Sequence, residues 1–511
     1  MTEKEYISAI ATIVSDYRKK ELDIPLDENH VAKWLDQFEE SERYIVIKEM
    51  FQILSRNYIK AEKIEMFLTQ IIEKVKNDSD GLENVAFLNL QTKGKSQDLF
   101  CEMVKDICKN EYEIDCKIIT SEQDIGDEKI YVYIDDGMYT GYRSAKDILP
   151  LITNILPEGT SLKIYYMVAY SNAFFYYESK FRDQARNRNI AISFEVGQYK
   201  NNDRNVESSK IDFIWPEEKV NVFPEVAAYE KKLKQTGKAN YLYDPWAQGS
   251  NPGMFTDYES RESVEAIFLK YGIRIANKIG RSTYRPLGIS NTPSFGFGSI
   301  YITDFNISNT CPLVLWWGNL ADNTDDPIGC WYPLFPRRTN NMVYQEIEEH
   351  EMHYSLDNYK SILSTVYRLA QEEKQKNCRV SKESFIDLWD IDLDEIVNRR
   401  ERSNLLQYMR SLNMDQIKVI QTVMYMGRDY EYPSYSEEEW EELWIRMSED
   451  PEYVLPEKKV KVDNPDEVLL SWMDYLDFSK GWTDKDIEID QIYQKAPLAQ
   501  YLNRAFDILG L

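Results

Sequence analysis

Histidine is scarce in this chain of 511 residues, which contains only His30, His350 and His353. The scarcity of histidine therefore does not favour a hydrolase that activates a serine or a cysteine with a histidine base. The spacing of His350 and His353 in EEHEMHYS would place both imidazoles on one face of a helix. Two interpretations stay open for that pair: a solvated polar face, or a metal site completed by neighbouring glutamates.

Cysteine pairs, long apolar runs and a secretion signal are missing too. The six cysteines contain no Cys-x-x-Cys pair, so neither a disulfide framework nor a zinc ribbon is indicated. No run of about 18 apolar residues occurs, and residues 1–21 lack a basic segment followed by an apolar one. Glycine and proline are too few for a collagen-like or low-complexity chain. We therefore expect a cytoplasmic chain of globular domains without membrane association.

Positive charge is also in short supply. The chain has 61 Lys and Arg against 87 Asp and Glu, a formal net charge of −26. Such a surface repels phosphate on average, so no direct nucleic-acid binding is expected. Residues 431–490 contain 19 acidic and six basic residues and so contribute half of the net charge. That window is either a solvated surface or a docking face for a basic partner.

Hydrophobic periodicity indicates an α/β protein in three parts. Residues 1–80 place apolar residues at the three- and four-residue spacing of amphipathic helices. From residue 84, short apolar runs alternate with helical patterns, which is typical of β-α-β units and a parallel sheet. From about residue 340 the pattern is helical again. We expect an N-terminal helical region (1–80), an α/β domain with a parallel sheet (81–338) and a C-terminal all-helical domain (339–511).

The most informative stretch is Lys129–Ser144, KIYVYIDDGMYTGYRS, in which an apolar strand ends in Asp135 and Asp136. A short loop then leads into a helix. Ligands of parallel sheets bind at the carboxyl ends of the strands. Thr140 and Gly141 occupy the turn that opens the helix, where backbone N–H groups and the helix dipole suit a phosphate. Two carboxylates just before it would suit the hydroxyls of a sugar; the alternatives are a divalent metal or a helix cap.

The same stretch resembles the phosphoribosyl-pyrophosphate (PRPP) loop of type I phosphoribosyltransferases. The resemblance implies a type I parallel-sheet core, a glycosyltransferase activity, and Mg²⁺ bound together with PRPP. Upstream, VAFLNLQTKGKSQDLF has the order strand, loop and helix that this family uses for its pyrophosphate loop. The implied catalytic residues are Asp135, Asp136, Lys93 and Lys95, and the implied PRPP-binding residues are Gly94, Ser96, Gly137, Met138, Tyr139, Thr140, Gly141, Tyr142, Arg143 and Ser144.

Later motifs point to a narrower family. The segments RPLG, FGFG, NTCPLVLWWGN and WYPLFPRR are similar to the phosphoribosyltransferase-like domain of bacterial conflict systems. That resemblance implies an antiphage effector, retron modules included, that acts toxically on nucleotide metabolism when it is released or activated. Its implied partners are PRPP or a nucleotide, and the reverse transcriptase–nucleic acid complex of a retron. The segments QTVMYMGRDY and APLAQYLNRAFDILGL resemble a small helical domain of unknown function.

Some residues depart from the type I pattern, which uses small residues so that the backbone can approach the phosphates. Met138 and Tyr139 are bulky, and Tyr142 and Arg143 replace a small residue and a threonine. The Arg143 side chain could compensate by binding the phosphate itself. The alternative, which stays open here, is a pocket that has changed its ligand or lost catalysis.

Three functions therefore stay open: a transferase, a non-catalytic sensor or regulatory subunit that binds PRPP or a nucleotide, and a purely structural subunit. Phosphoribosyl transfer depends mainly on electrostatic stabilisation, so the scarcity of histidine is compatible with it. No motif indicates a nucleobase-binding hood. Trp331 and Tyr332 either stack on a base or pack in the interior.

Overall fold

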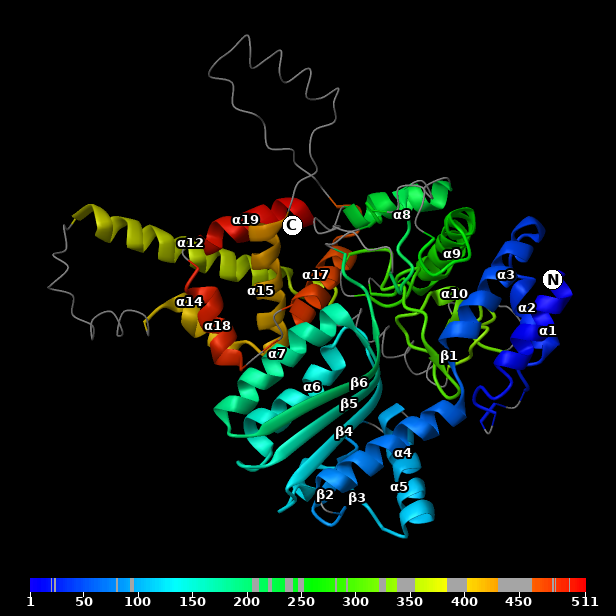
Figure 1. Ribbon diagram of the computed structural model, residues 1–511. Helices are drawn as coiled ribbons and strands as arrows, with labels where there is room; N and C mark the ends of the chain where they lie inside the picture. The colour runs from blue at the N-terminus through cyan, green and yellow to red at the C-terminus, as the bar shows by residue number, and fades with distance from the viewer. Residues whose placement is uncertain are drawn as a thin grey trace.

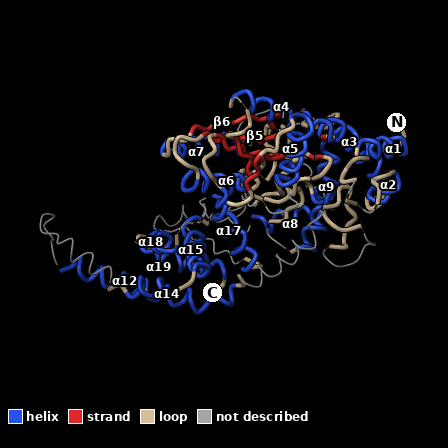
Figure 2. The backbone as a smooth tube through the Cα atoms, turned by 90° about the horizontal axis from the view of Figure 1, so that it is seen from below, coloured by secondary structure: helices blue, strands red, loops and turns tan. Residues whose placement is uncertain are grey.

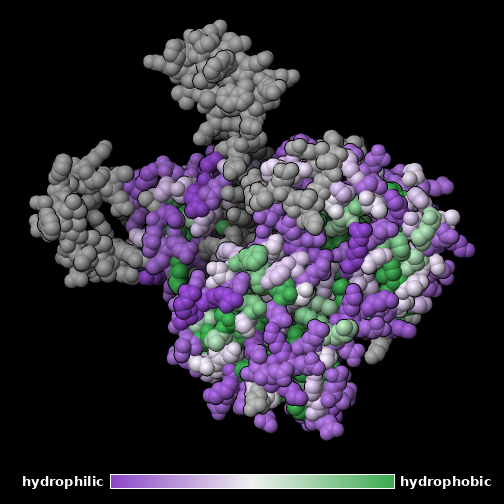
Figure 3. Space-filling view, viewed as in Figure 1, coloured by the Kyte–Doolittle hydropathy of each residue, from purple (hydrophilic) through white to green (hydrophobic). Residues whose placement is uncertain are grey.

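The computed structural model arranges helices around a parallel β-sheet (Figure 1). Among the described residues its helices are too short or too polar to cross a membrane. Figure 3 shows the visible face as predominantly hydrophilic, with apolar residues gathered in patches. The structure describes residues 1–19, 21–22, 24–79, 81–91, 96–204, 211–218, 223–234, 242–246, 252–280, 283–290, 293–320, 328–337, 354–383, 402–430, 462–479, 482, 484–495 and 497–511.

The central sheet has five strands in the order β3-β2-β4-β5-β6, and all neighbouring strands are parallel. From β2 the chain first moves to β3 on one side and then returns to β4 on the other side. In open sheets of this kind, ligands bind at the carboxyl ends of the strands where the order reverses. Here that position lies between β2 and β4. The strands are β2 (Val85–Leu88), β3 (Lys117–Ile119), β4 (Ile130–Met138), β5 (Ser161–Tyr170) and β6 (Ala191–Lys200).

Helices cover both faces of this sheet (Figure 2). Successive side chains of a strand point to opposite faces. In β4, Val132 and Ile134 therefore join the core under α4 (Ala61–Asp78) and α5 (Ser96–Tyr112). Tyr131 and Tyr133 join the core on the other face, under α6, η2 and α7. Burial on both faces explains why the strands read as continuous apolar runs. The second set comprises α6 (Tyr142–Pro150), the π-helical turn η2 (Leu151–Ile155) and α7 (Ser171–Asn187).

The N-terminal helices share one hydrophobic core with residues 214–335. For example, the indole nitrogen of Trp34 in α2 donates a hydrogen bond of 2.8 Å to the carbonyl of Val314. The short strands β1 and β7 add a parallel pair between the two segments. The division of the chain at residues 80 and 338 stays a prediction. The elements are α1 (Glu3–Ile13), α2 (Glu28–Leu35), α3 (Glu40–Asn57), β1 (Tyr58–Ile59), α8 (Pro224–Lys234), α9 (Tyr258–Ile279), β7 (Ile302–Thr303) and α10 (Leu313–Trp316).

The C-terminal part forms a helical body with its own core. Its helices α15 and α19 approach so closely that a Cβ atom at Gly427 would collide with the backbone of Tyr501. An ion pair of 2.9 Å between Lys232 of α8 and Glu467 of α17 connects this body to the rest. The helices are α12 (Lys360–Glu383), α14 (Asn404–Ser411), α15 (Met414–Asp429), α17 (Pro465–Ser479), α18 (Lys485–Tyr493) and α19 (Leu498–Leu509).

Candidate functional site

The acidic pair lies inside β4 rather than at its end. The strand continues through Met138, because Gly137 and Met138 pair with Val168 and Ala169 of β5. The expectation that Gly137 and Met138 belong to the loop is therefore wrong. Both aspartates are buried, with exposed fractions of 4% for Asp135 and 6% for Asp136.

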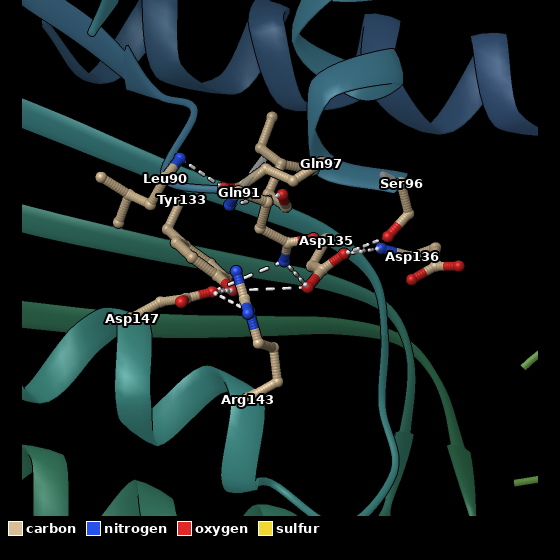
Figure 4. A network of polar contacts seen from close by, with 10 residues as sticks. Leu90, Gln91, Ser96, Gln97, Tyr133, Asp135, Asp136, Arg143 and Asp147 are labelled. Carbon is tan, nitrogen blue, oxygen red and sulfur yellow. Dashed lines mark hydrogen bonds and ion pairs between the residues drawn. The ribbon is translucent and has the colours of Figure 1, made fainter. Parts of the chain in front are cut away.

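The Asp135 carboxylate is held by the protein on both oxygens (Figure 4). One oxygen accepts hydrogen bonds from the Ser96 hydroxyl at 3.0 Å and from the backbone N–H of Asp136 at 2.9 Å. The other accepts from the Gln91 amide at 3.0 Å and from the Tyr133 hydroxyl at 3.3 Å. Ser96 begins α5, so this carboxylate connects the loop after β2 to β4. Four donors make Asp135 an organising residue of the site.

Asp136 differs from its neighbour. Its carboxylate lies beside that of Asp135 (Figure 4) and accepts a hydrogen bond of 3.3 Å from the Asn306 side chain. Asn306 lies just after β7, in a segment far from β4 in the sequence. Of the two aspartates, Asp136 is therefore the better placed to accept hydrogen bonds from a ligand.

A third carboxylate, Asp147 of α6, completes the network and was not predicted from the sequence. It accepts hydrogen bonds from the Tyr133 hydroxyl at 3.2 Å and from the Gln91 amide at 3.5 Å. The guanidinium of Arg143, one helical turn earlier, donates to the same carboxylate at 3.2 Å. The i, i+4 spacing of Arg143 and Asp147 was the available signal.

Burial changes the protonation of these carboxyl groups. Burial, together with the charge of the adjacent Asp136, raises the pKa of Asp135 from 3.8 to about 8. Burial also raises the pKa of Asp136 and that of Asp147, the latter against the lowering effect of Arg143. Closely spaced carboxyl groups in a buried site do not all ionise together. The cluster therefore retains a proton near neutral pH and releases it when a cation or strong donors arrive.

The turn after β4 leaves the N-terminus of α6 accessible to a ligand. Gly141 caps the helix in the left-handed region, with φ of +75°, and within the described chain no side chain caps it. A Cβ atom at Gly141 would collide with the Tyr177 ring, so only glycine fits there. The helix directs the amides of residues 142–144 out of its N-terminus, the arrangement that binds phosphate in other proteins.

The bulky residues of this loop do not fill the phosphate position. Met138 is 1% exposed and packs in the core between the sheet and α6 and α7. The Tyr139 ring folds back over Gly137, where a Cβ atom would come within 2.8 Å of it. It packs near Tyr170 and Tyr301, with ring centroids 5.8 and 6.4 Å away. The departures from small residues therefore leave the backbone of the turn accessible.

Two neighbouring cavities form a cleft at this edge of the sheet. One, of about 320 Å³, is lined by the two aspartates and by Arg18, Asn306 and Arg337 from outside the sheet. The other, of about 380 Å³, lies between residues 137–144 and residues 283–290. Both are lined by Gly137, Tyr139, Arg143 and Asn309, so they are parts of one cleft.

Two arginines face the acidic pair, and they differ in how they are held. Arg18 makes an ion pair of 2.8 Å with Glu21 and donates a hydrogen bond of 2.7 Å to the Pro336 carbonyl. Arg337 lies 4.9 Å above the Trp316 ring, and its guanidinium has no hydrogen-bond acceptor among the described residues. Burial lowers the pKa of Arg337. A half-buried cation without a hydrogen-bond acceptor among the described residues favours a ligand that brings negative charge.

The other predicted residues divide into those that the structure describes and those outside it. Ser96, Thr140, Tyr142 and Ser144 lie in or beside the cleft. Lys93, Gly94 and Lys95 lie outside the described residues, as do His350, His353 and residues 431–461 of the acidic window.

Trp331 and Tyr332 do not stack on a ligand. They are 5% and 3% exposed and belong to the core around α2. The Trp331 indole donates a hydrogen bond of 2.8 Å to the Val314 carbonyl, and the Tyr332 hydroxyl lies 2.8 Å from Nδ1 of His30. These hydrogen bonds satisfy their polar atoms, so both residues have a structural role. Burial lowers the pKa of His30, which agrees with a neutral core histidine.

The site thus combines a parallel sheet, a buried acidic pair and an open helix N-terminus near the switch point of the sheet. The family model named PRTase-CE matches residues 31–337, and the chain belongs to this family. The match covers the central sheet, α2, α3 and the segment that carries Arg337. No curated protein and no solved structure gives a significant match.

Proposed function

We propose that the cleft binds PRPP, or a nucleotide with the same ribose 5-phosphate, and that the protein is a phosphoribosyltransferase-like enzyme. The observation that supports this most is the order of groups along one edge of the sheet. A buried acidic pair on β4 is followed within five residues by the open N-terminus of α6. Carboxylates suit the ribose hydroxyls, and the helix amides suit the 5′-phosphate.

Each group has a proposed role. Asp136 accepts hydrogen bonds from the ribose hydroxyls, while Asp135 holds the strand and the loop before α5 in register. The amides of residues 142–144 bind the 5′-phosphate together with the Arg143 side chain. Arg337 faces the pyrophosphate or an anionic acceptor. The role that the resemblance implies for Lys93 and Lys95 is electrostatic stabilisation of the pyrophosphate. All of these groups bind and orient the substrate. Transfer from a phosphate-rich substrate depends mainly on such positioning and on electrostatic stabilisation.

In the reaction, the bond between ribose C1 and the pyrophosphate oxygen breaks, and its electron pair leaves with the pyrophosphate. A lone pair of the acceptor forms the new bond to C1. Cationic side chains on the leaving diphosphate act mainly in the transition state, where negative charge builds up on it.

Mg²⁺ fits this site only when the phosphates of a bound substrate supply part of its ligands. The described residues contain no cluster of three metal-ligating side chains. Mg²⁺ is commonly held by one or two carboxylates together with substrate phosphates. Asp136 would supply such a carboxylate, and Mg²⁺ would neutralise charge on the pyrophosphate.

The biological setting is part of the proposal. Family membership and the motif resemblance support an antiphage effector that damages nucleotide metabolism when it is released from a retron-like complex. The net charge of −26 supports recruitment through a basic protein surface rather than direct binding to nucleic acid. Sequencing the neighbouring genes tests this setting, and a reverse transcriptase gene next to this one would support it.

Thermal unfolding with PRPP and Mg²⁺ tests the binding site. At about one hundred times its dissociation constant, PRPP should stabilise the fold by about 2.7 kcal/mol. Asp136→Asn should remove most of that gain, whereas the matched control Asp183→Asn, exposed on α7, should keep it. No stabilisation of the wild-type protein by PRPP, ribose 5-phosphate or a nucleotide would contradict the proposal.

A non-catalytic sensor is the second candidate. It is favoured by the four protein donors that already hold Asp135, because these organise the site without a substrate. Release of pyrophosphate from PRPP distinguishes the two candidates. For an enzyme, the double variant Lys93→Ala and Lys95→Ala should cut turnover while leaving sugar-phosphate binding largely intact. Tight binding of PRPP without any turnover, under a range of acceptors, would identify the sensor.

A further inference from the structure

A third cavity, of about 260 Å³, lies away from the cleft, where α8 meets α17. Its walls come from α8, from the loop at residue 285, and from residues 463–471 of the C-terminal helical body. Figure 1 shows the two helices α8 and α17 that contribute to these walls. The ion pair between Lys232 and Glu467 bridges the same gap.

Two residues that line this cavity carry a buried hydrogen-bond donor without a partner among the described residues. Arg285 is 3% exposed, and its Nε atom is buried without a hydrogen-bond acceptor. The hydroxyl of Ser471, which is 2% exposed, is also buried without a partner. A buried polar group left without a hydrogen bond costs about 1–3 kcal/mol. Two such groups in one cavity indicate a missing polar ligand.

The charges around these donors determine what that ligand is. Lys231 and Lys232 of α8 line the cavity beside Arg285, and Glu467 already neutralises Lys232. Arginine and lysine donors around a hydroxyl suit a compact anion with several acceptor oxygens. Asp463 and Asn464 lie at the exposed side of the cavity. The small volume suits a phosphate group with a small body attached, since pockets for drug-sized ligands are larger.

The loop that carries Arg285 also forms a wall of the cleft. Thr283, Tyr284 and Ser290 line the cavity beside the N-terminus of α6. The loop is anchored by backbone hydrogen bonds from Ser290 to Thr283, at 3.0 Å, and from Gly288 to Arg285, at 2.9 Å. An anion bound to Arg285 therefore touches an element shared by both cavities.

We propose that this cavity is a second ligand site, which binds a small phosphorylated molecule and clamps the C-terminal helical body onto the phosphoribosyltransferase-like domain. The phosphate accepts hydrogen bonds from Arg285 and Ser471 and pairs with Lys231. The site does not depend on the function proposed for the cleft. Ligand binding here stabilises the contact between α8 and α17 and restrains the loop at residues 283–290.

Hydrogen exchange of the full chain with inorganic phosphate tests this site separately from the cleft. At about ten times its dissociation constant, phosphate should slow exchange about tenfold in segments whose opening releases the ion. We expect this slowing in residues 224–234 and 465–479, and its loss in Arg285→Gln and in Ser471→Ala. Any protection of residues 139–147 should persist in these variants, because phosphate bound at α6 is unaffected.

A second variant, Lys231→Gln, keeps the test valid if Arg285→Gln does not fold. Lys231 is exposed, so Lys231→Gln should fold normally and still weaken the phosphate effect on α8 and α17. The matched control is Lys234→Gln on the same helix, whose ammonium pairs with Glu230 and does not line the cavity. The proposal is overturned if phosphate leaves α8 and α17 unprotected in the wild type. It is equally overturned if Lys231→Gln and Ser471→Ala both behave like the wild type.

Discussion

The two walls of the cleft are built in different ways. One wall, the strand β4 and the start of α6, comes from a single continuous stretch that contains Asp135, Asp136 and Arg143. The other wall is assembled from Arg18, from the loops around residues 283–290 and 306–309, and from Arg337. The first wall carries the buried carboxyl groups together with Arg143, and the second carries Arg18 and Arg337. A continuous wall is visible as a motif, whereas an assembled wall appears only once the chain has folded.

The largest effect is expected from a substitution in the turn of the continuous wall, at Gly141. Gly141→Ala puts a Cβ atom into the Tyr177 ring and forces a left-handed conformation on a residue with a side chain. Strain and overpacking together should lower the free energy of unfolding by about 3 kcal/mol. The check is denaturant unfolding of the full chain. PRPP binding should weaken as well, because the amides of residues 142–144 move.

Gly159→Ala is the matched control for this variant. Gly159 has φ of +80°, but nothing lies within 4 Å of an added Cβ atom. It should therefore show only the backbone strain, about 1 kcal/mol. Equal losses for both variants would mean that the Tyr177 contact does not determine the shape of the turn.

The acidic pair predicts a pH dependence of stability without ligand. The pKa of Asp135 is raised from 3.8 to about 8 by burial and by Asp136, so the folded protein holds this proton more tightly than the unfolded chain does. The resulting stability is fully present below about pH 4 and is lost as the pH rises towards 8. Its slope is at most about 1.4 kcal/mol per pH unit.

Asp135→Asn should remove this contribution. The difference in unfolding free energy between wild type and variant, measured from pH 4 to 8, should change steadily in favour of the variant as pH rises. Bound PRPP with Mg²⁺ should reduce the effect, because a nearby cation favours the ionised pair. A difference that is constant over this pH range would show that Asp135 is ionised throughout.

Sequence reasoning works well for the continuous wall and poorly for the assembled one. The part of β4 that leads up to Asp135 and Asp136 is predicted by its apolar run, and the turn at Thr140 and Gly141 by its place before a helix. The continuation of β4 past the acidic pair is missed, because pairing with β5 decides where the strand ends. Arg18 and Arg337 are 319 residues apart in the chain. No local pattern indicates that the fold brings them to the same cavity.

The two arginines of the assembled wall are expected to have different roles, Arg337 in ligand binding and Arg18 in stability. Substitution of each one tests this. Arg337→Gln should reduce the affinity for PRPP or pyrophosphate about tenfold, equivalent to about 1.4 kcal/mol, because a half-buried cation near the anion is lost. The free energy of unfolding should fall by only about 0.5–1 kcal/mol, because among the described residues the guanidinium loses its contact with the Trp316 ring but no hydrogen bond. Arg18→Gln should instead lower the stability by about 1–2 kcal/mol, since it loses Glu21 and the Pro336 carbonyl. Calorimetric titration and denaturant unfolding of both variants check this, and a reversed pattern would contradict the assignment.

The smallest expected effect concerns Arg143, where the two cavities meet. Its side chain is 42% exposed and pairs with Asp147 at i, i+4 spacing, so Arg143→Gln should cost only about 0.3–0.5 kcal/mol of stability. Arg368→Gln on α12 is a suitable control, because Arg368 is exposed and pairs with Glu372 at the same spacing. Both variants should therefore unfold alike. Only Arg143→Gln should weaken the binding of ribose 5-phosphate, by a few-fold, because its guanidinium reaches the phosphate position. Equal affinity in the two variants would place the phosphate on the backbone amides alone.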